Sequence, residues 1–496
     1  MMEKIPSEVF NISEKLTQTD YKAYLVGGCV RDIALGKTPK DWDIATNAKP
    51  QEIQKLFPQS IYENSFGTVA VKTNSSDESL KIIEITSFRL EGKYTDKRHP
   101  DEIKFAKTIE EDLARRDFTV NAMALKLNSK FQVSNYNLDR MESFIDPYSG
   151  EKDIGAKLIC CVGNPTERFS EDALRLMRAV RLAVELGFTI EENTASAIRE
   201  NAPLLNAIAK ERLRDELIKI IMSKSAMQGI QLLEDMSLLK YIIPELRSGI
   251  NCEQNLHHIY TVWEHNLRAL DYAAGKSYPL EIRLAALLHD VAKPQTKRGT
   301  GRNSTFYGHE VAGARETGKI LKRLAFSKET MDKIVHLVRY HLFYYNVGDV
   351  TPAGVRRFIK RVGIENVEDL IKVREADRIG SGVPKAVPYK IRHLMFMVEK
   401  VRKDPVNPKM LAVNGTGLIE KLNLKPGPII GQILDILLEE VLDNPEKNDK
   451  KLLLEEAEEL LRMSYDELES LRQKAKNRKE EFEEGIEGEL RGKFHV

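Results

Sequence analysis

The chain has 496 residues, of which 42% are hydrophobic and 30% are charged, and its formal net charge is +1. This length exceeds what one hydrophobic core organises, so we expect several domains. The charge balance excludes a uniformly basic nucleic-acid-binding protein, and no apolar stretch is long enough to span a bilayer. Four cysteines without a CxxC pair and an N-terminus without a signal-like apolar core predict a cytoplasmic protein.

Strand-like and helix-like segments alternate in the first third of the chain. The strand-like AYLV leads into a helical VRDIALG, and DWDIAT, GTVAVKT and KIIEITSF also have strand character. The charged stretch from Lys93 to Glu111 lacks clear periodicity and is expected to be a long loop. We predict an α+β fold, with a small mixed sheet and helices in a domain of residues 1–146 and mostly helical domains after it.

Two acidic residues in DWDIAT form the first candidate site. Side chains two apart on a strand share a face, so Asp41 and Asp43 should lie together, with Trp42 and Ile44 on the opposite face. Paired carboxylates on a rigid element suit Mg²⁺ that also holds substrate phosphates, and two such ions can support phosphoryl transfer. Considered alone, such a pair is more often an ordinary surface turn.

A glycine pair upstream strengthens the interpretation of a nucleotide site. Gly27 and Gly28 close a strand and open a helix, a geometry in which backbone N–H groups approach a phosphate. Arg31, in the first turn of that helix, is placed to bind triphosphate oxygens in a bidentate manner.

The combination of LVGGCVRD and DWDIAT resembles the head domain of class II nucleotidyltransferases, the group that contains CCA-adding enzymes and bacterial poly(A) polymerases. The resemblance continues through RRDFTVNAMAL and implies that Arg116 and Asn121 line the nucleotide pocket. It also implies a third carboxylate, for which Glu84 in IIEITSFR is the candidate, although an exposed strand glutamate is nearly as good an explanation. The segment YTDKRHP, Tyr94 to Pro100, corresponds to the family's flexible loop, whose presence argues against an enzyme that adds only CC.

A helical neck and body are expected over residues 147–250. RFSEDALRLMRAVRLAVELGF is predicted to be one amphipathic helix on which Glu171, Asp172 and Arg175 share a face. The segment falls where the resembled family has its EDxxR amino-acid template. We therefore expect Asp172 and Arg175 to read the base and Glu171 to orient Arg175, although an isolated EDxxR would be an ordinary helix salt bridge.

Three further basic positions follow in this region. Arg178 and Arg181 continue along the predicted template helix. They are expected to hold the triphosphate or the RNA backbone, with solvated helix charge as the alternative. Farther on, KERLRDELIKII resembles the family's supporting helix and suggests that Glu211 and Arg212 are structural ties.

Histidines concentrate in the next region, residues 251–385. Scattered His and Asp on helices suit a divalent site for phosphate-ester hydrolysis. The order H…HD…H…H…D resembles the HD-domain phosphohydrolases, and the resemblance implies a second divalent metal of unknown identity, with His336 as an alternative to His341. The expected ligands are His265, His289, Asp290, His309, His341 and Asp377.

The last region, residues 386–496, is expected to hold a helical tRNA-binding module and a charged tail, most simply a solvated helix pair. Taken together, we expect an enzyme that adds CCA to the tRNA 3′ end from CTP and ATP. The alternatives are an A-adding enzyme, a poly(A) polymerase, a metal phosphohydrolase with an RNA-gripping head, and a non-catalytic RNA-binding scaffold. The sequence does not set the oligomeric state.

Overall fold

The computed structural model describes residues 5–62, 67–90, 104–127, 144–255, 259–343, 345–347, 352–383, 385–403, 411–443 and 445–474. The chain forms two compact units. The first comprises residues 1–339 and 376–383, and the second comprises residues 340–375 and 384–496. Within the described residues, no helix combines the length and the apolar character needed to cross a bilayer.

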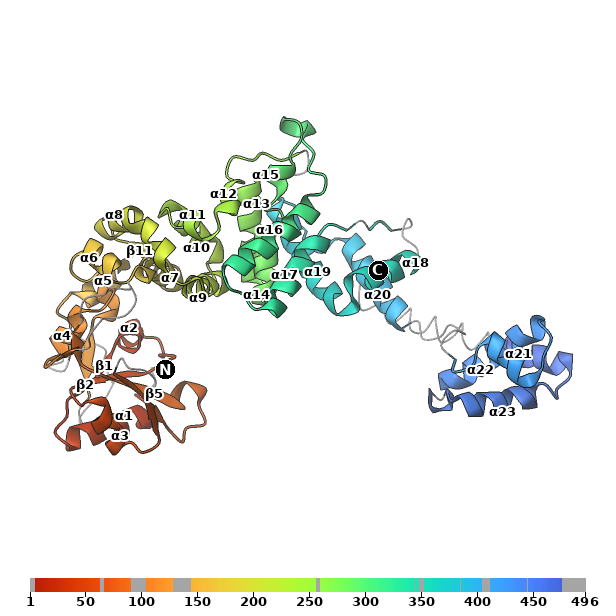
Figure 1. Ribbon diagram of the computed structural model, residues 1–496, viewed down its shortest axis with the longest axis horizontal. Coiled ribbons are helices and arrows are strands. Elements are labelled where there is room, and N and C mark those ends of the chain that lie inside the picture. Colours follow the sequence, from red (N-terminus) through yellow and green to blue (C-terminus); the bar gives the residue numbers. More distant parts are fainter. Residues whose placement is uncertain are drawn as a thin grey trace. The chain divides into compact units, whose positions relative to one another are not determined.

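A seven-stranded mixed sheet organises the start of the first unit (Figure 1). Its strand order is β3-β4-β5-β2-β1-β8-β9, in which β2 and β5 run parallel and the other neighbours run antiparallel. Helices α1 (Ser7–Gln18) and α3 (Pro50–Leu56) pack against it. The strands are β1 (Ala23–Val26), β2 (Asp43–Thr46), β3 (Ser60–Tyr62), β4 (Thr68–Lys72), β5 (Ile82–Ser87), β8 (Ala124–Lys126) and β9 (Phe144–Ile145). The predicted α+β class is confirmed.

Part of the stretch predicted as a long loop forms regular secondary structure. Strands β6 (Arg89–Leu90) and β7 (Lys104–Phe105) pair, and helix α4 (Ile109–Ala114) follows them. Helix α4 begins because Thr108 caps it: the Thr108 hydroxyl accepts from the Glu111 backbone N–H, and the Glu111 carboxylate accepts in return. The loop prediction was therefore wrong for this part, while Tyr94 to Pro100 lies outside the described residues.

Helices build the remainder of the first unit. They pack through buried apolar faces, as in the amphipathic α7 and α9, which contact each other. The helices are α2 (Gly28–Ala34), α5 (Gly150–Ala156), α6 (Pro165–Glu171), α7 (Leu174–Leu186), α8 (Glu192–Asn201), α9 (Lys210–Met222), α10 (Ala226–Asp235), α11 (Leu239–Ile242), α12 (Pro244–Arg247), α13 (Val262–Gly275), α14 (Leu280–Leu288), α15 (Lys293–Thr296), α16 (His309–Arg323) and α17 (Lys328–Tyr340). Helix α19 (Ile364–Gly380) contributes its last turn to this unit.

The second unit contains helices α18 (Pro352–Val362), α20 (Tyr389–Lys403), α21 (Gly415–Leu422), α22 (Pro428–Asp443) and α23 (Lys450–Leu460). Helices α21 to α23 share one core, which includes Leu418, Leu437, Leu453 and Leu468. The Glu/Lys-rich segment was expected to be a solvated helix pair, and its described part is helical over residues 450–460 and 465–474. One face of this pair is not solvated, because Leu453, Leu460 and Leu468 are buried in the core shared with α22.

Candidate functional site

The paired aspartates lie at the start of β2, next to β5. Asp43 is the first residue of β2 and stands opposite Glu84 of β5 in the parallel register. Trp42 and Ile44 are buried, at 5% and 1% exposure, whereas Asp41 is exposed. The prediction that Trp42 and Ile44 face the core is confirmed, whereas Asp41 precedes the strand, so that its sharing a strand face with Asp43 stays a prediction. Asp43 and Glu84 are thus carried by two adjacent strands, and Asp41 immediately precedes the first of them.

Burial makes the Asp43 carboxylate difficult to charge. Burial raises the pKa of Asp43 above its usual value, the positive charge of Arg116 lowers it, and the negative charge of Asp41 raises it again. Additional positive charge beside Asp43 would stabilise the ionised form of its carboxylate. The site therefore favours a cation, and carboxylate oxygens are the ligands that hard divalent ions prefer.

At Gly27 the backbone lies close to the side chains of Asp43 and Arg116. Gly27 links β1 to α2 with a φ of 76°, in the left-handed region. A Cβ at Gly27 would lie 2.8 Å from Arg116 Nη1 and 3.6 Å from Asp43 Oδ2. Only a glycine leaves this space open. The predicted Gly27-Gly28 turn, Arg116 and Asp43 are therefore brought together.

Arg116 is held in this position by a buried acid. Asp112, at 1% exposure, pairs through Oδ2 with Arg116 Nη2 at 3.3 Å and through Oδ1 with Arg115 Nη2 at 2.8 Å. Burial raises the pKa of Asp112, but the charges of Arg115 and Arg116 outweigh this effect and lower it. The sequence reasoning did not single out Asp112, although its spacing of four residues from Arg116 was a visible signal.

Arg31 and Asn121, each predicted to contact the nucleotide, are hydrogen-bonded to each other. Arg31 Nη1 donates to Asn121 Oδ1 at 2.8 Å, and Arg31 Nε and Nη2 donate to Asp32 Oδ1. Asn121 ends the short 3₁₀ helix η2 (Thr119–Asn121), and its backbone carbonyl accepts from Arg116 Nη1 at 3.5 Å. Arg31, Asn121 and Arg116 thus form one hydrogen-bonded group.

The predicted template helix is interrupted at its centre. Helix α6 ends at Glu171, Asp172 has extended backbone angles, and α7 begins at Leu174. At the break, Asp172 Oδ1 accepts from the Leu174 N–H at 3.0 Å, so its side chain binds the first backbone N–H of α7, whose N-cap residue is Ala173. The single continuous helix was therefore a wrong prediction.

The contact between Glu171 and Arg175 is nevertheless present. Arg175 Nη1 lies 2.6 Å from Glu171 Oε2 and also donates to the Arg168 carbonyl. Arg175 is buried at 7% exposure, and Arg168 binds the same Glu171 oxygen at 3.0 Å. Asp172 instead pairs with Arg212 of α9. The expected orientation of Arg175 by Glu171 fits this geometry.

The next two arginines on α7 are paired with acids. Arg178 Nη2 lies 2.6 Å from Asp117 Oδ2, and the charge of Asp117 raises the pKa of Arg178. Arg181 Nε lies 3.1 Å from Glu216 Oε2. Both arginines are thus paired with acidic side chains, so the alternative that they are solvated helix charges is wrong. Their proposed contacts with triphosphate or RNA stay predictions.

Comparison with known proteins places this geometry in a family. The Poly A polymerase head domain model matches residues 23–160, the model of the probable RNA and SrmB-binding site of polymerase A matches 187–250, and that of the putative tRNA nucleotidyltransferase domain 2 matches 311–457. The CCA-adding enzyme of Ligilactobacillus salivarius is 31% identical over 465 residues, which cover 93% of this chain and 99% of that protein. The chain belongs to the CCA-adding enzyme family.

Other members of the CCA-adding enzyme family agree in sequence and fold. The Geobacillus kaustophilus enzyme is 41% identical over 236 residues, or 47% of this chain and 54% of that protein. The structure of the Bacillus stearothermophilus CCA-adding enzyme in complex with CTP is similar at a TM-score of 0.59 and 28% identity, covering 92% of this chain and 97% of that one. The nucleotidyltransferase family depends on divalent metal ions, which the carboxylates of β2 and β5 suit.

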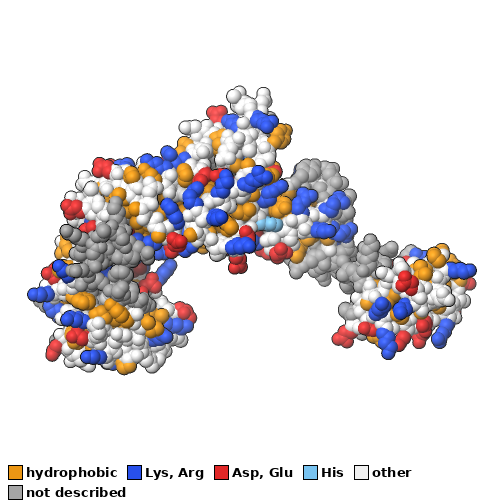
Figure 2. All heavy atoms as spheres, in the orientation of Figure 1, with side chains coloured by type: hydrophobic (Ala, Val, Ile, Leu, Met, Phe, Trp, Pro, Cys, Tyr) orange, Lys and Arg blue, Asp and Glu red, His pale blue; other side chains and the backbone are white. Residues whose placement is uncertain are grey.

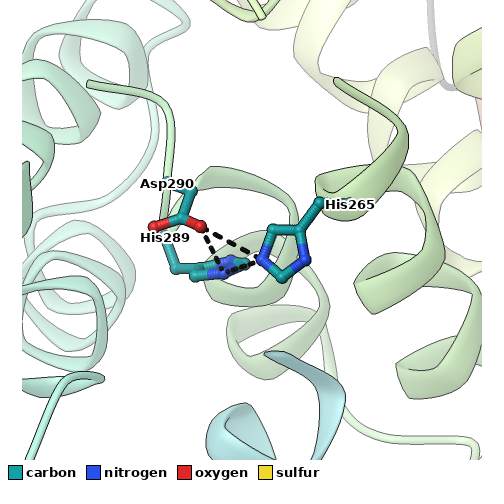
Figure 3. Close-up of side chains that lie close together, drawn as sticks. All are labelled: His265, His289 and Asp290. Carbon is teal, nitrogen blue, oxygen red and sulfur yellow. Dashed lines mark hydrogen bonds and ion pairs between the residues drawn. The ribbon is translucent and has the colours of Figure 1, made fainter. Parts of the chain in front are cut away.

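A second candidate site lies in the first unit. Most of its residues come from the part of the chain between the second matched segment, which ends at residue 250, and the third, which begins at residue 311, and one more comes from α19. His265 is on α13, His289 and Asp290 follow α14, and His309 begins α16. Figure 3 shows His265, His289 and Asp290 pointing toward one another. Their ligand atoms lie within 4.8 Å of one another, and all three residues are buried. The sequence prediction that these residues meet is confirmed.

Two more predicted ligands have different outcomes. Asp377 Oδ1 of α19 lies 3.4 Å from His265 Nε2 and 3.6 Å from His289 Nε2, so it joins the group. His341 is buried at the start of the second unit, and its role as a ligand stays a prediction.

Charge is concentrated in this buried group. Burial lowers the pKa of His289, but the charge of Asp290 and hydrogen bonds to Asp290 and Asp377 raise it to about 10. Lys293 Nζ lies 2.6 Å from Asp290 Oδ2 and donates to Gln254 Oε1 at 2.7 Å. The sequence reasoning missed Lys293, although its spacing of three residues from Asp290 was a visible signal. Such a group of imidazoles and carboxylates suits a divalent transition-metal ion.

The exposed surface shows no broad field of one charge. In Figure 2, Lys and Arg side chains are interspersed with Asp and Glu side chains over the described part of the visible face. This agrees with the net charge of +1. Any affinity for RNA must therefore come from local groups of basic residues.

Proposed function

We propose that this chain adds CCA to the 3′ end of tRNA from CTP and ATP, with Mg²⁺ as the metal. The 3′-hydroxyl oxygen attacks the α-phosphorus, the bond to the bridging oxygen of pyrophosphate breaks, and the hydroxyl proton is released. Membership of the CCA-adding enzyme family carries the proposal, and the opposed Asp43 and Glu84 beside Gly27 support it. Because its substrates would be tRNA, CTP and ATP, the cytoplasm is the proposed compartment.

Each part of the head has a role in this reaction. Asp41, Asp43 and Glu84 supply oxygens to divalent ions, which when bound stabilise the charge that develops on the phosphate oxygens. The open space at Gly27 lets the triphosphate approach the backbone, and Gly28 extends that turn. Arg116, held by Asp112, and Arg31, held by Asn121, present guanidinium groups for the triphosphate.

Base choice is assigned to Asp172 and Arg175. A carboxylate accepts from the exocyclic amine that cytosine and adenine carry, whereas uracil and guanine present a carbonyl there. Arg175 donates to a ring acceptor beside it. Under the same proposal, residues 1–146 form the catalytic head, 147–250 the neck and body, 251–385 the histidine domain and 386–496 the tRNA-binding module.

Three RNA substrates test this function. Purified protein is incubated with tRNA lacking CCA, tRNA ending in CC, and oligo(A), each with one nucleotide at a time and Mg²⁺. We expect C to be added to the first and A to the second, with little extension of oligo(A). Addition of A without C to the first substrate would instead establish an A-adding enzyme, and efficient extension of oligo(A) would establish a poly(A) polymerase.

A second activity is proposed at the histidine site. The convergence of three buried ligands with Asp377 supports divalent-metal-dependent hydrolysis of a phosphate ester at an RNA end. Water adds to phosphorus, the bond to the ribose oxygen breaks, and that oxygen takes a proton. RNA ending in a 2′,3′-cyclic phosphate is the test substrate. Asp290→Asn should stop this hydrolysis and leave CCA addition intact, whereas hydrolysis that survives Asp290→Asn would remove the proposal.

A further inference from the structure

The backbone at the end of α4 is held by two arginines from α6 and α7. Arg168 Nη2 donates to the Ala114 carbonyl oxygen at 2.6 Å. Arg175 Nη2 donates to the next carbonyl oxygen, that of Arg115, at 3.3 Å. Ala114 is the last residue of α4 and Arg115 is its C-cap, so these carbonyls belong to the helix end, where intrahelical donors are lacking. Two arginines more than fifty residues farther along the chain therefore satisfy the end of this helix.

Asp117, two residues after Arg115, is also bound from α7. Arg178 Nε donates to Asp117 Oδ2 at 2.7 Å. Burial raises the pKa of Asp117, but the positive charges of Arg178 and Arg175 outweigh this effect and lower it, so the carboxylate is ionised at neutral pH. Because consecutive Cα atoms are only about 3.8 Å apart, contacts at residues 114, 115 and 117 leave the backbone of Arg116 little room to move.

Arg168 also binds the pair formed by Glu171 and Arg175. Arg168 Nη1 donates to Glu171 Oε2 at 3.0 Å, and the same oxygen accepts from Arg175 Nη1 at 2.6 Å. Arg168 Nε donates to the Val162 carbonyl oxygen at 3.2 Å, and the Arg168 side chain is only 18% exposed. The three nitrogens of one planar guanidinium thus have separate partners, which fixes the positions of those partners relative to one another.

Arg116 extends this arrangement to the acidic group of the head. A Cβ at Gly27 would lie 2.8 Å from Arg116 Nη1 and 3.6 Å from Asp43 Oδ2, so both side chains border the same turn. A shift of the Arg116 backbone would therefore move a guanidinium at the place where the triphosphate is proposed to bind. Through the end of α4, the base-reading Arg175 and the triphosphate-binding Arg116 depend on the same set of contacts.

We propose that Arg168 is a positioning residue that couples base readout to triphosphate binding. By holding Glu171, it keeps Arg175 in place for the base. By holding the Ala114 carbonyl, it keeps Arg116 in place for the triphosphate. Arg168 acts through these two arginines and needs no contact of its own with the nucleotide. The inference rests on the proposed nucleotide transfer, and it predicts that one substitution weakens both halves of nucleotide binding.

Calorimetric binding of CTP, UTP and inorganic tripolyphosphate separates the two halves. Each is titrated with Mg²⁺ into the full chain without tRNA, so that no transfer occurs. The ratio of the Kd for UTP to the Kd for CTP measures base readout, and the Kd for tripolyphosphate, which has no base, measures the triphosphate site. In Arg168→Ala we expect the ratio to fall and the tripolyphosphate Kd to rise by about 10-fold each, because each half loses the support of a charge-assisted hydrogen bond.

Three further variants give this result its controls. Asp172→Ala should lower the UTP-to-CTP ratio alone, because Asp172 is proposed to contact only the base. Arg199→Ala, which changes an arginine of α8 paired with Glu192, should behave as the wild type. Arg168→Lys keeps the charge but loses the planar fork, so both measurements should remain impaired. Thermal unfolding establishes that each variant is folded, and Arg168→Gln replaces Arg168→Ala if that variant unfolds.

Wild-type values in Arg168→Ala, a change in only one of the two measurements, or full recovery in Arg168→Lys would each overturn the coupling. Addition of C to tRNA is measured separately. If both binding effects are found but the wild type adds no C to tRNA, the proposed function alone is refuted. If the wild type adds C while Arg168→Ala binds all three compounds normally, the coupling alone is refuted.

Discussion

Arg212 holds the carboxylate of Asp172 with two hydrogen bonds, Nη2 to Oδ2 at 3.0 Å and Nη1 to Oδ1 at 3.4 Å. Asp172 Oδ1 also accepts from the Leu174 N–H. Three donors therefore fix the acceptor that is proposed to read the base amine. An acceptor that is already oriented discriminates better, because ordering it on binding would cost free energy.

The first prediction concerns Asp172 itself. Asp172→Ala should reduce the preference for CTP and ATP over UTP and GTP by about 5- to 150-fold, since a good bidentate base contact contributes about 1–3 kcal/mol. The rate of transfer with CTP should fall less, because the metal ligands are unchanged. The measurement is kcat/KM for each nucleotide on tRNA lacking CCA. Unchanged selectivity would refute the template role.

Arg212 should act on selectivity through Asp172. Arg212→Ala leaves the Asp172 carboxylate in place but removes two of its hydrogen-bond donors. We expect the preference for CTP and ATP over UTP and GTP to fall by about 3- to 10-fold, because water replaces the lost donors and the net free energy lost is about that of one hydrogen bond. Lys219→Ala, on the same helix with a half-exposed side chain, is the control. Adding Arg212→Ala to Asp172→Ala should change selectivity little further. Additive losses would mean that the two residues act separately.

Glu84 is distinguished from an ordinary strand glutamate by its register with Asp43. Glu84→Gln keeps the size of the side chain but removes a charge from the metal site, so we expect kcat for C addition to fall about 100-fold or more. Glu78→Gln is the control, because Glu78 is 86% exposed and its ion pair with Lys81 contributes little. Near-normal kcat in Glu84→Gln across a Mg²⁺ titration would leave only Asp41 and Asp43 as ligands.

Local features of the sequence were sufficient to predict some side-chain faces and contacts. The alternation of Asp41, Trp42, Asp43 and Ile44 fixed which side chains face the core, because a strand repeats every two residues. The spacing of four residues between Glu171 and Arg175 likewise predicted their contact, and that contact survives the break between α6 and α7.

Contacts that depend on tertiary packing were not predictable in this way. Asp172 and Arg212 are 40 residues apart, and Arg31 and Asn121 are 90 apart, so no helix or strand period relates them. The break at Asp172 was missed because the apolar pattern continues through it, while the deciding contact is a side chain bound to a backbone N–H. The local sequence pattern thus determines which face of a strand or helix is buried, whereas tertiary packing determines which distant side chains pair with each other.

The left-handed backbone of Gly27 predicts a strong effect of a single methyl group. Gly27→Ala should lower the free energy of unfolding by about 1–2 kcal/mol, because its φ of 76° disfavours a Cβ. The Cβ would also displace Arg116, so we expect kcat/KM for CTP to fall about 100-fold.

Gly155→Ala is the matched control for this substitution. Gly155 lies in α5, and a Cβ added there would meet no atom within 4 Å, so alanine should raise the free energy of unfolding by about 0.5–1 kcal/mol and leave activity unchanged. Urea unfolding measures both variants. If Gly27→Ala has the same stability and activity as the wild-type protein, the turn accommodates a Cβ and the predicted clash with Arg116 is wrong.

The pair formed by Asp112 with Arg115 and Arg116 predicts a pH-dependent contribution to stability. Asp112→Asn leaves two partly buried guanidinium groups without their acid, so it should lower the free energy of unfolding at pH 7 by about 3–5 kcal/mol. Because the folded-state pKa of Asp112 is lowered, the wild-type advantage is fully present above the unfolded pKa of about 3.9 and is lost as pH falls through the folded value.

Urea unfolding of both proteins between pH 7 and pH 3 measures this advantage. The difference between wild type and Asp112→Asn should be constant from pH 7 to about pH 5 and should shrink below about pH 4, where Asp112 begins to take up a proton in the unfolded chain. Glu78→Gln supplies the control for an exposed acid and should show almost no difference at any pH. A difference that stays constant to pH 3 would mean that the asparagine destabilises the head by packing, because loss of the charge would then contribute nothing.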